Sequence, residues 1–365
     1  MQKSWYLNIT FFCFLFLQAF IVITIAEGIL PPKYFYDANT IRDQFALAQQ
    51  FPFSFSTDSF INTAKFYQLL GFDKLGIRVL EGYGSYVLVY VCLIVILVKA
   101  KAHLSMKAIT IVVVWNVLFG IYLGQLSKDV IAFITITLLL LIILLERKAS
   151  VVAYIGLFIL YALLFRTYWF IYLYFILLNY IIIFNSYNTK IFSRKFSKLF
   201  FYAAAIIVLF FAADFVGVHL TDSRSEVNMY RLDSSDAVTI LINPFDNSSF
   251  LTDALNWIIV WFLCFFPIML FKNMNLLVLC FVGWNLYNTH LIAKIIKSGF
   301  VSSRPLKLIV SMIISFSATQ ALFEPDLGSL LRHELAVIPL FIFLFLKFTA
   351  QFEKRKEMDK EYHGA

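Results

Sequence analysis

Eleven apolar runs recur along the chain and constrain its fold more than any other feature. Apolar residues make up 61% of the sequence and charged residues only 14%, whereas roughly a quarter of the residues in a soluble domain are charged. A soluble chain of this kind would have too few polar side chains to cover its surface. The sequence therefore predicts an all-α polytopic integral membrane protein, in which residues 1–365 form a single multi-span domain. The runs cover about residues 5–25, 83–98, 108–124, 130–145, 151–165, 167–185, 200–216, 256–271, 276–293, 306–322 and 335–349.

Two adjacent runs must be separated by a break. Residues 151–184 are almost continuously apolar, and as one helix they would extend ~51 Å, well beyond the ~30 Å hydrocarbon core. A break at Arg166–Trp169 gives two short spans with an arginine at the turn. The first run follows Lys3 and has no small-residue cleavage site after it. It therefore predicts a retained signal anchor rather than a removed signal peptide.

The distribution of basic residues predicts the topology. With the N-terminus in the cytoplasm, 20 of the 30 Lys and Arg residues fall on the cytoplasmic side together with five acids, as the positive-inside rule requires. The run 276–293 breaks this alternation and is rich in polar residues, so we expect it to be re-entrant or in-plane. The result is about ten transmembrane helices plus one such segment, with both termini cytoplasmic. The net charge of +8 is then a topological signal, and no nucleic acid is expected as a partner.

Three segments lie outside the expected spans. Two outward segments, 27–82 and 217–255, are too long to be simple turns, and loops of that size are usually functional or carry helices of their own. The cationic segment 350–365 predicts a solvated cytoplasmic tail near anionic headgroups.

Ionisable residues gather at the outward ends of the expected spans, where they are candidates for function. Guanidinium groups bind phosphate oxygens in a bidentate manner and stay charged in any environment. Alternatively, each arginine pairs with a carboxylate (Arg224 with Asp222 or Glu226, Arg332 with Glu334), or Arg166 extends to the membrane interface. The outward group comprises Lys128, Asp129, Arg166, Arg224, Arg231, Arg332, His333 and Glu334.

The segment 323–334 concentrates acids, an arginine and a histidine between two expected spans. Pro325 and Gly328 predict a turn there. His333 can act as a general base or serve as a hydrogen-bonded loop histidine. Glu324 and Asp326 are alternative bases, and the sequence does not choose among the three.

Several motifs are missing from the sequence. It has no Walker loop, no dinucleotide fingerprint, no HExxH and no CxxC pair. We therefore expect no cofactor and no metal. The four cysteines lie in apolar stretches and imply no disulfide framework.

The outward arginines and the EPDLGSLLRHE segment resemble the bacterial O-antigen and capsule repeat-unit polymerases, the Wzy family. Further stretches that carry the resemblance are Ser127-Lys128-Asp129, Phe165-Arg166-Thr-Tyr-Trp169, Arg224 with Arg231, and Asp236 to Pro244 before a span that ends near Pro267. Together they cover most of residues 125–350. The first third of the chain matches only in its hydropathy and its outward loop.

The resemblance implies a GT-C-like glycosyltransferase in the bacterial inner membrane, active at the periplasmic face. It would join undecaprenyl-pyrophosphate-linked repeat units into O-antigen or capsular polysaccharide, and the partners that the resemblance implies are a flippase and a chain-length regulator. The implied roles are diphosphate binding by Arg166, Arg224, Arg231 and Arg332, base catalysis by His333, Glu324 or Asp326, glycan stacking by Tyr168, Trp169 and Tyr230, and support by Lys128, Asp129, Asp236 and Asn243.

Two alternatives stay open. A ligase would transfer finished polymer to lipid A core or protein, and the sequence separates it poorly from a polymerase. A transporter or lipid flippase would be expected to carry charges inside its helices and to have small outer loops. Here the charges gather on one side, which favours the enzyme.

Overall fold

The computed structural model describes residues 2–50, 58–101, 105–181, 195–229, 239–267 and 276–363. Side chains are described for these residues except 2–8, 148, 195–197, 276–278, 280 and 353–363. Within these ranges the chain is helical without any strand, and the one β-type pairing is an isolated bridge between Ile240 and Asp326. The prediction of an all-α fold is confirmed.

The chain divides into two compact units, of which the second is inserted into the first. Unit 1 comprises Met1–Trp169 and Leu335–Ala365, and unit 2 comprises Phe170–Glu334. Unit 1 contains α1 (Gln2–Ile29), η1 (Pro32–Phe35), α2 (Tyr36–Asp43), α3 (Phe45–Gln50), α4 (Ser59–Leu69), η2 (Phe72–Lys74), α5 (Arg78–Ala100), α6 (Met106–Tyr122), α7 (Lys128–Leu144), α8 (Lys148–Leu164) and α16 (Ile338–His363).

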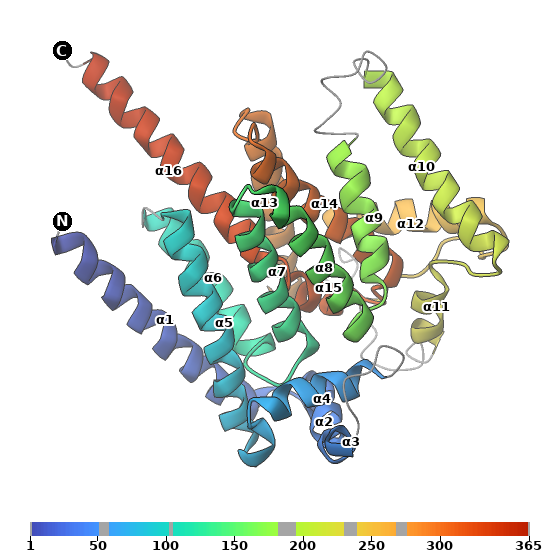
Figure 1. The fold of residues 1–365 in the computed structure, drawn as a ribbon, viewed down its shortest axis with the longest axis horizontal. Coiled ribbons are helices and arrows are strands. Elements are labelled where there is room, and N and C mark those ends of the chain that lie inside the picture. The colour runs from blue at the N-terminus through green and yellow to red at the C-terminus, as the bar shows by residue number, and fades with distance from the viewer. Residues whose placement is uncertain are drawn as a thin grey trace. The chain divides into compact units, whose positions relative to one another are not determined.

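The long helices of unit 1 pack side by side (Figure 1). α1 lies against α5 and α6, α7 lies against α5 and α8, and α16 returns to lie against α5 and α7. Small residues allow the close approach of α1: a Cβ on Gly124 would lie 2.4 Å from Cγ1 of Ile23. Small residues at interfaces are typical of membrane helix pairs, because the lipid supplies no hydrophobic driving force.

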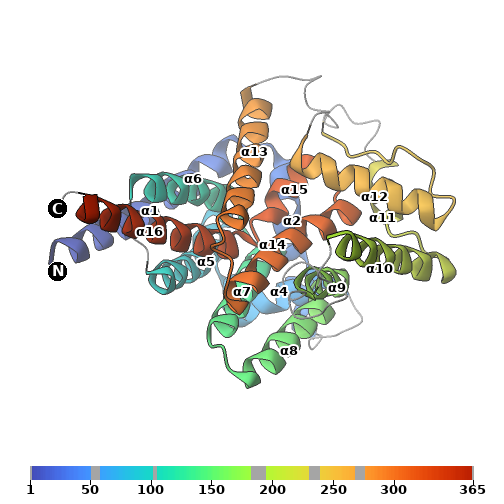
Figure 2. The same cartoon turned by 90° about the horizontal axis from the view of Figure 1, so that it is seen from above.

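Unit 2 contains nearly all of α9 (Trp169–Asn179), together with α10 (Lys195–Phe215), α11 (Asp222–Met229), α12 (Phe250–Phe265), α13 (Leu276–Lys297), α14 (Arg304–Phe323) and α15 (Leu327–Glu334). α12 packs against α10, α13 and α14, and Figure 2 shows α10 beside α12. Trp257 of α12 is buried at the centre of this core. It stacks on Phe175 at 5.5 Å and donates through Nε1 to the Ala318 carbonyl at 2.8 Å.

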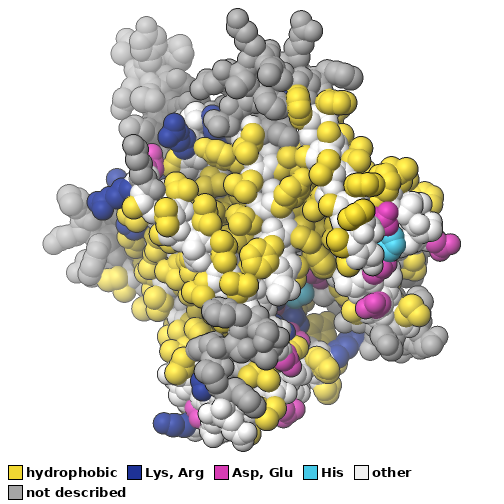
Figure 3. Space-filling view, turned by 45° about the vertical axis from the view of Figure 1, so that its right-hand side comes forward, with side chains coloured by type: hydrophobic (Ala, Val, Ile, Leu, Met, Phe, Trp, Pro, Cys, Tyr) yellow, Lys and Arg dark blue, Asp and Glu magenta, His cyan; other side chains and the backbone are white. Residues whose placement is uncertain are grey.

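Hydrophobic side chains face outward over much of the surface (Figure 3). On α1, Phe14, Leu17, Ile21 and Ile25 recur along one face and are 49–62% exposed. A soluble protein rarely exposes a continuous apolar face of this kind. Lipid is therefore the expected environment of these helices.

Four helices in the described residues are long and apolar enough to cross a membrane: Ile9–Ile29, Arg78–Ala100, Lys198–Phe215 and Arg304–Phe323. The pair α15 and Ile338–Phe352, bent by 63°, would make a fifth. Four shorter apolar helices of 10–17 residues accompany them: Met106–Tyr122, Ala149–Leu164, Trp169–Asn179 and Phe250–Phe265. The chain thus has the helices of a membrane-embedded protein, while the expected count of about ten spans stays a prediction.

Several local expectations can be compared directly with the structure. The break at Arg166 is confirmed, because α8 ends at Leu164 and α9 begins at Trp169. The outward segment 27–82 does carry helices of its own, namely η1, α2, α3, α4 and η2. The segment 350–365 is helical as far as His363, where α16 ends, while its solvated cytoplasmic position stays a prediction. The region 276–293 belongs to one continuous helix, α13, without an internal break.

Candidate functional site

The first group of predicted site residues lies in unit 1, where α7 begins and α8 ends. The Ser127 side chain caps α7 by accepting a hydrogen bond from the backbone N–H of Asp129 at 3.0 Å. The fully buried Asp129 carboxylate forms an ion pair with Arg166, whose Nη1 donates to the Tyr168 hydroxyl at 2.6 Å. Burial opposes the charge of Arg166, but Tyr168 and Asp129 outweigh it and raise the pKa of Arg166 well above its usual value. Arg166 is therefore permanently charged and has a dedicated carboxylate partner.

Helix α4, which lies within the segment 27–82, holds the ends of α7 and α8 that carry the Asp129–Arg166 pair. Nδ2 of Asn62 donates to the Leu164 carbonyl at 2.7 Å and so binds the last turn of α8. The Tyr67 hydroxyl donates to the Ser127 carbonyl at 3.0 Å and accepts from the Ser127 N–H at 3.1 Å. Leu164 and Ser127, which lie near the two members of the ion pair in the sequence, are thus both bound by buried side chains of α4.

Lys128 points to the same helix. Its Nζ donates to Oγ of Ser59 at 2.7 Å and lies 3.1 Å from the ring centroid of Phe60. Burial, followed by the positive charge of Arg166, lowers the pKa of Lys128 to about 8, against the opposite effect of nearby aspartates. Lys128 is therefore a charge held by α4 rather than the residue that neutralises Asp129.

The predicted glycan-stacking residues differ in accessibility. Trp169 is fully buried and packs against Tyr161 at 4.0 Å and Phe158 at 5.1 Å. Its ring is part of the unit 1 core and presents no open face to a sugar. Tyr168 is half-buried and bound to Arg166. Tyr230, Arg231 and Asp236 lie outside the described residues.

The second group lies in unit 2 around the C-terminal end of α14. Arg224 is fully buried: its Nη1 donates to the Ala321 carbonyl and its Nη2 to Oδ1 of Asn243. Its Nε has no hydrogen-bond partner among the described residues. Burial lowers the pKa of Arg224 to about 10, although Cys264 and Asp253 act in the opposite direction. The group stays protonated at neutral pH and caps α14, whose C-terminal carbonyls favour a cation.

The expectation that Arg224 pairs with Asp222 or Glu226 is wrong in the described part of the chain. Both of its hydrogen-bond partners there are neutral carbonyl oxygens, and Asp222 instead accepts from Nδ2 of Asn247 at 2.6 Å. The carbonyl partner lies 97 residues further along the chain. No sequence rule for neighbouring residues would have found it.

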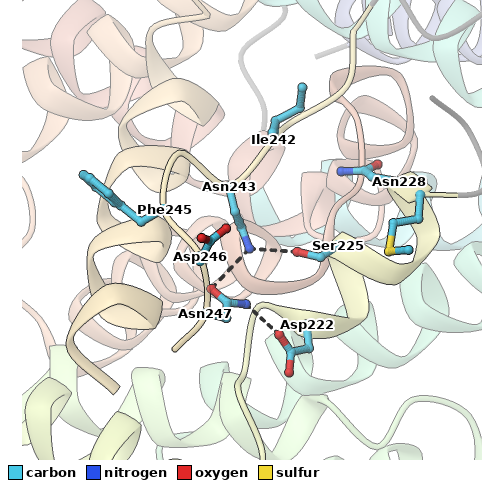
Figure 4. A pocket seen from close by; sticks show the side chains of 9 residues that line it. Asp222, Ser225, Asn228, Ile242, Asn243, Phe245, Asp246 and Asn247 are labelled. Carbon is cyan, nitrogen blue, oxygen red and sulfur yellow. Dashed lines mark hydrogen bonds between the residues drawn. The ribbon is translucent and has the colours of Figure 1, made fainter. Parts of the chain in front are cut away.

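Asn243 connects Arg224 to a cavity of about 340 Å³ (Figure 4). Its Nδ2 donates to Oγ of Ser225 at 2.8 Å and to Oγ1 of Thr221 at 3.0 Å, while its Oδ1 faces the guanidinium. The amide orientation is therefore fixed by Arg224. The cavity is lined by Asp222, Ser225, Asn228 and Met229 from α11 and by Ile242, Asn243, Phe245, Asp246 and Asn247 from the following loop.

The third group is a histidine–carboxylate pair that bridges the turn between α14 and α15. Glu324 is 2% exposed and binds Nδ1 of His333, while its second oxygen has no hydrogen-bond partner in the part of the chain that the structure describes. Nη2 of Arg332 lies 3.5 Å from Nε2 of His333. A carboxylate that holds one imidazole nitrogen leaves the other as a proton acceptor, which is the arrangement of a general base.

Asp326 has a different place in this turn. Its Oδ1 accepts from the backbone N–H of Ser329 at 2.8 Å, so it caps α15. Gly328 therefore lies in the first turn of a helix rather than in a loop. Glu324 is the acid that binds Nδ1 of His333.

Sequence reasoning singled out the arginines and His333, but of the residues that line the cavity it named only Asn243 as a site residue. The polar lining residues that it did not name as site residues are Asp222, Ser225, Asn228, Asp246 and Asn247. Asn, Asp and Ser are also common in ordinary turns, so their density in 217–255 was a weak signal. No protein-family model, curated protein or solved structure matches the chain.

Proposed function

We propose that this protein is a membrane glycosyltransferase that joins undecaprenyl-pyrophosphate-linked oligosaccharide repeats into O-antigen or capsular polysaccharide. One observation carries the proposal: His333 is bound by the buried Glu324 on one side and lies 3.5 Å from Arg332 on the other. The pair supplies a proton acceptor, and the guanidinium supplies a phosphate-binding group. Both are needed when a hydroxyl displaces a diphosphate.

The proposed reaction is balanced without a cofactor. An acceptor hydroxyl oxygen bonds to the anomeric carbon of the donor sugar, and the bond from that carbon to the diphosphate oxygen breaks. The hydroxyl proton passes to Nε2 of His333, whose Nδ1 is held by Glu324. The bonding electron pair leaves with undecaprenyl diphosphate, and Arg332 stabilises its growing charge.

The other arginines have unequal parts in this proposal. A preorganised donor to a developing anion typically contributes about 10²–10³ in rate. Arg332 is only partly buried and is therefore the arginine that we expect to contact the diphosphate directly. Arg224 has no exposed surface, so its positive charge would act through its field and through Asn243. Arg166 already has Asp129 as a partner, and we assign it chiefly to positioning.

The finer topology belongs to the same proposal. We place the protein in the bacterial inner membrane, with about ten spans in a GT-C-like arrangement, both termini cytoplasmic and the candidate groups at the periplasmic face. The uneven distribution of Lys and Arg supports this orientation. A flippase that delivers the repeats and a chain-length regulator are the partners expected of such an enzyme.

The test is a gel of surface polysaccharide from a strain that lacks this gene, complemented with variants. Wild type should restore a ladder, and His333→Gln should reduce extension about 10²–10⁴-fold, the usual loss for a missing general base. His219→Gln is the matched control, because His219 is a partly exposed loop histidine beside Asp214. Single repeats on the lipid anchor in the deletion strain support the polymerase. Full-length polymer stranded on its carrier would indicate a ligase, and an unchanged ladder a transporter.

A further inference from the structure

We infer that the cavity between α11 and the loop 242–247 binds an uncharged sugar of the acceptor glycan. The assignment of this sugar to the acceptor glycan rests on the proposed function. The binding of a neutral sugar is argued from the cavity alone. None of the sequence motifs identified this cavity, and only one of its lining residues, Asn243, was among the predicted site residues.

The cavity is built on one face of a short helix. Asp222, Ser225 and Met229 recur at helical spacing along α11, and Asn228 lies beside them (Figure 4). The opposite wall is the loop from Ile242 to Asn247. The volume of about 340 Å³ lies in the lower part of the range of small-molecule sites, ~300–1,000 Å³. This is the size class of a mono- or disaccharide.

Asn228 fixes one wall of the cavity. Its side chain is 5% exposed, and its Nδ2 donates to the Leu241 carbonyl at 2.9 Å. Among the described residues its Oδ1 has no hydrogen-bond partner, but this atom is buried. A ligand in the cavity would therefore contact the carboxylates of Asp222 and Asp246 rather than this oxygen.

The lining chemistry selects the ligand class. Asp222 and Asp246 present acceptor oxygens, and a sugar presents hydroxyl donors. No lining residue in the described part of the chain is basic, so a phosphate or a sugar carboxylate would meet two carboxylates without a compensating contact from these residues. Phe245, 46% exposed, adds an apolar ring for the C–H face of a pyranose. Apolar walls with a few fixed polar groups are typical of small-ligand sites.

The backbone connects this cavity to the histidine pair. The Leu241 N–H donates to the Pro325 carbonyl at 2.8 Å, and the Leu327 N–H donates to the Thr239 carbonyl at 3.1 Å. These bonds bind the cavity loop to the turn that begins with Glu324. A sugar in the cavity would therefore be held by the same segment that positions His333, which favours the acceptor rather than the carrier lipid.

The experiment is saturation-transfer NMR on the purified full-length protein in detergent, with methyl glycosides of glucose, galactose and N-acetylglucosamine as probes. Wild type should receive transfer from at least one neutral glycoside, and methyl glucuronide should give several-fold less. Asp246→Asn combined with Phe245→Ala should reduce the transfer at least fivefold. The matched control combines Glu226→Gln with Phe215→Ala. These two residues are exposed, do not line the cavity, and should leave the signal unchanged.

The outcomes separate this inference from the proposed function. Equal transfer in wild type and the cavity variant, or no transfer from any neutral glycoside to wild type, overturns the sugar site. If the variant loses transfer while the deletion strain keeps its ladder, the sugar site stands and the polymerase falls. If the deletion strain loses its ladder and the cavity variant restores it fully, the polymerase stands and the acceptor role of the cavity falls.

Discussion

Two buried arginines, one in each unit, satisfy their charge in opposite ways. Arg166 in unit 1 has a fully buried carboxylate partner, Asp129. Arg224 in unit 2 is bound by two neutral carbonyl oxygens, and within the described part of the chain its Nε has no hydrogen-bond partner. A buried ion pair chiefly organises its surroundings, whereas a positive charge held by neutral carbonyls attracts anions more strongly. Arg166 and Arg224 were both predicted to bind diphosphate, but their surroundings in the structure lead us to expect different roles.

The largest effect is expected from breaking the Arg166 pair. Asp129→Asn leaves the guanidinium buried without its counter-charge, and a loss of about 3–5 kcal/mol of stability is expected. Arg166→Met should cost a comparable amount, because Asp129 is then unpaired. The double variant Asp129→Leu with Arg166→Met should recover most of the loss. Thermal unfolding in detergent measures this, and a double variant as unstable as either single one would refute the pairing argument.

A smaller effect on stability is expected at Arg224. Arg224→Met preserves the side-chain volume but leaves the Ala321 carbonyl and Oδ1 of Asn243 without donors, at a cost of about 1–3 kcal/mol. Part of this cost is offset, because the substitution also removes the cost of burying the Arg224 charge. In the polysaccharide assay the same variant should shorten the ladder. An Arg224→Met protein that loses as much stability as Asp129→Asn would remove the distinction between the two arginines.

The smallest effect is a pH dependence at Lys128. Its pKa in the folded state is lowered to about 8 by burial and by Arg166, against ~10.4 when unfolded. Between these values the unfolded chain holds a proton that the folded chain has lost, so stability rises with pH through this window and is unaffected below it. Wild type should gain about 2 °C in melting temperature between about pH 7.5 and 9.5 relative to Lys128→Met. An equal pH response in both proteins would contradict the lowered pKa.

Local features of the fold were predictable from the sequence. The break at Arg166 follows from the length of the apolar stretch, and the all-helical fold follows from composition. The apolar run 335–349 does not by itself show that α16 extends to His363, because charged residues near the end of a helix indicate solvent but do not prevent helix formation.

Pairings between distant residues were much harder to predict. Asp129 and Arg166 are 37 residues apart and were each singled out, yet nothing in the sequence joins them. The partner of Arg224 was sought among adjacent acids, whereas the helix end that it caps is brought near only by the fold. Glu324 and His333 were found together because only nine residues separate them across a short turn.

The bonds that anchor the cavity loop have a consequence for how such a protein can diversify. Leu241 and Leu327 contribute only backbone N–H groups, and Thr239 and Pro325 only backbone carbonyls, so these anchors tolerate changes of side chain. Substitutions at Ile242, Phe245 or Asp246 can then alter the shape of the cavity while leaving the turn with Glu324 in place. On the proposed function, single substitutions in this loop would change the preferred sugar while the proposed proton acceptor, His333, stays in place.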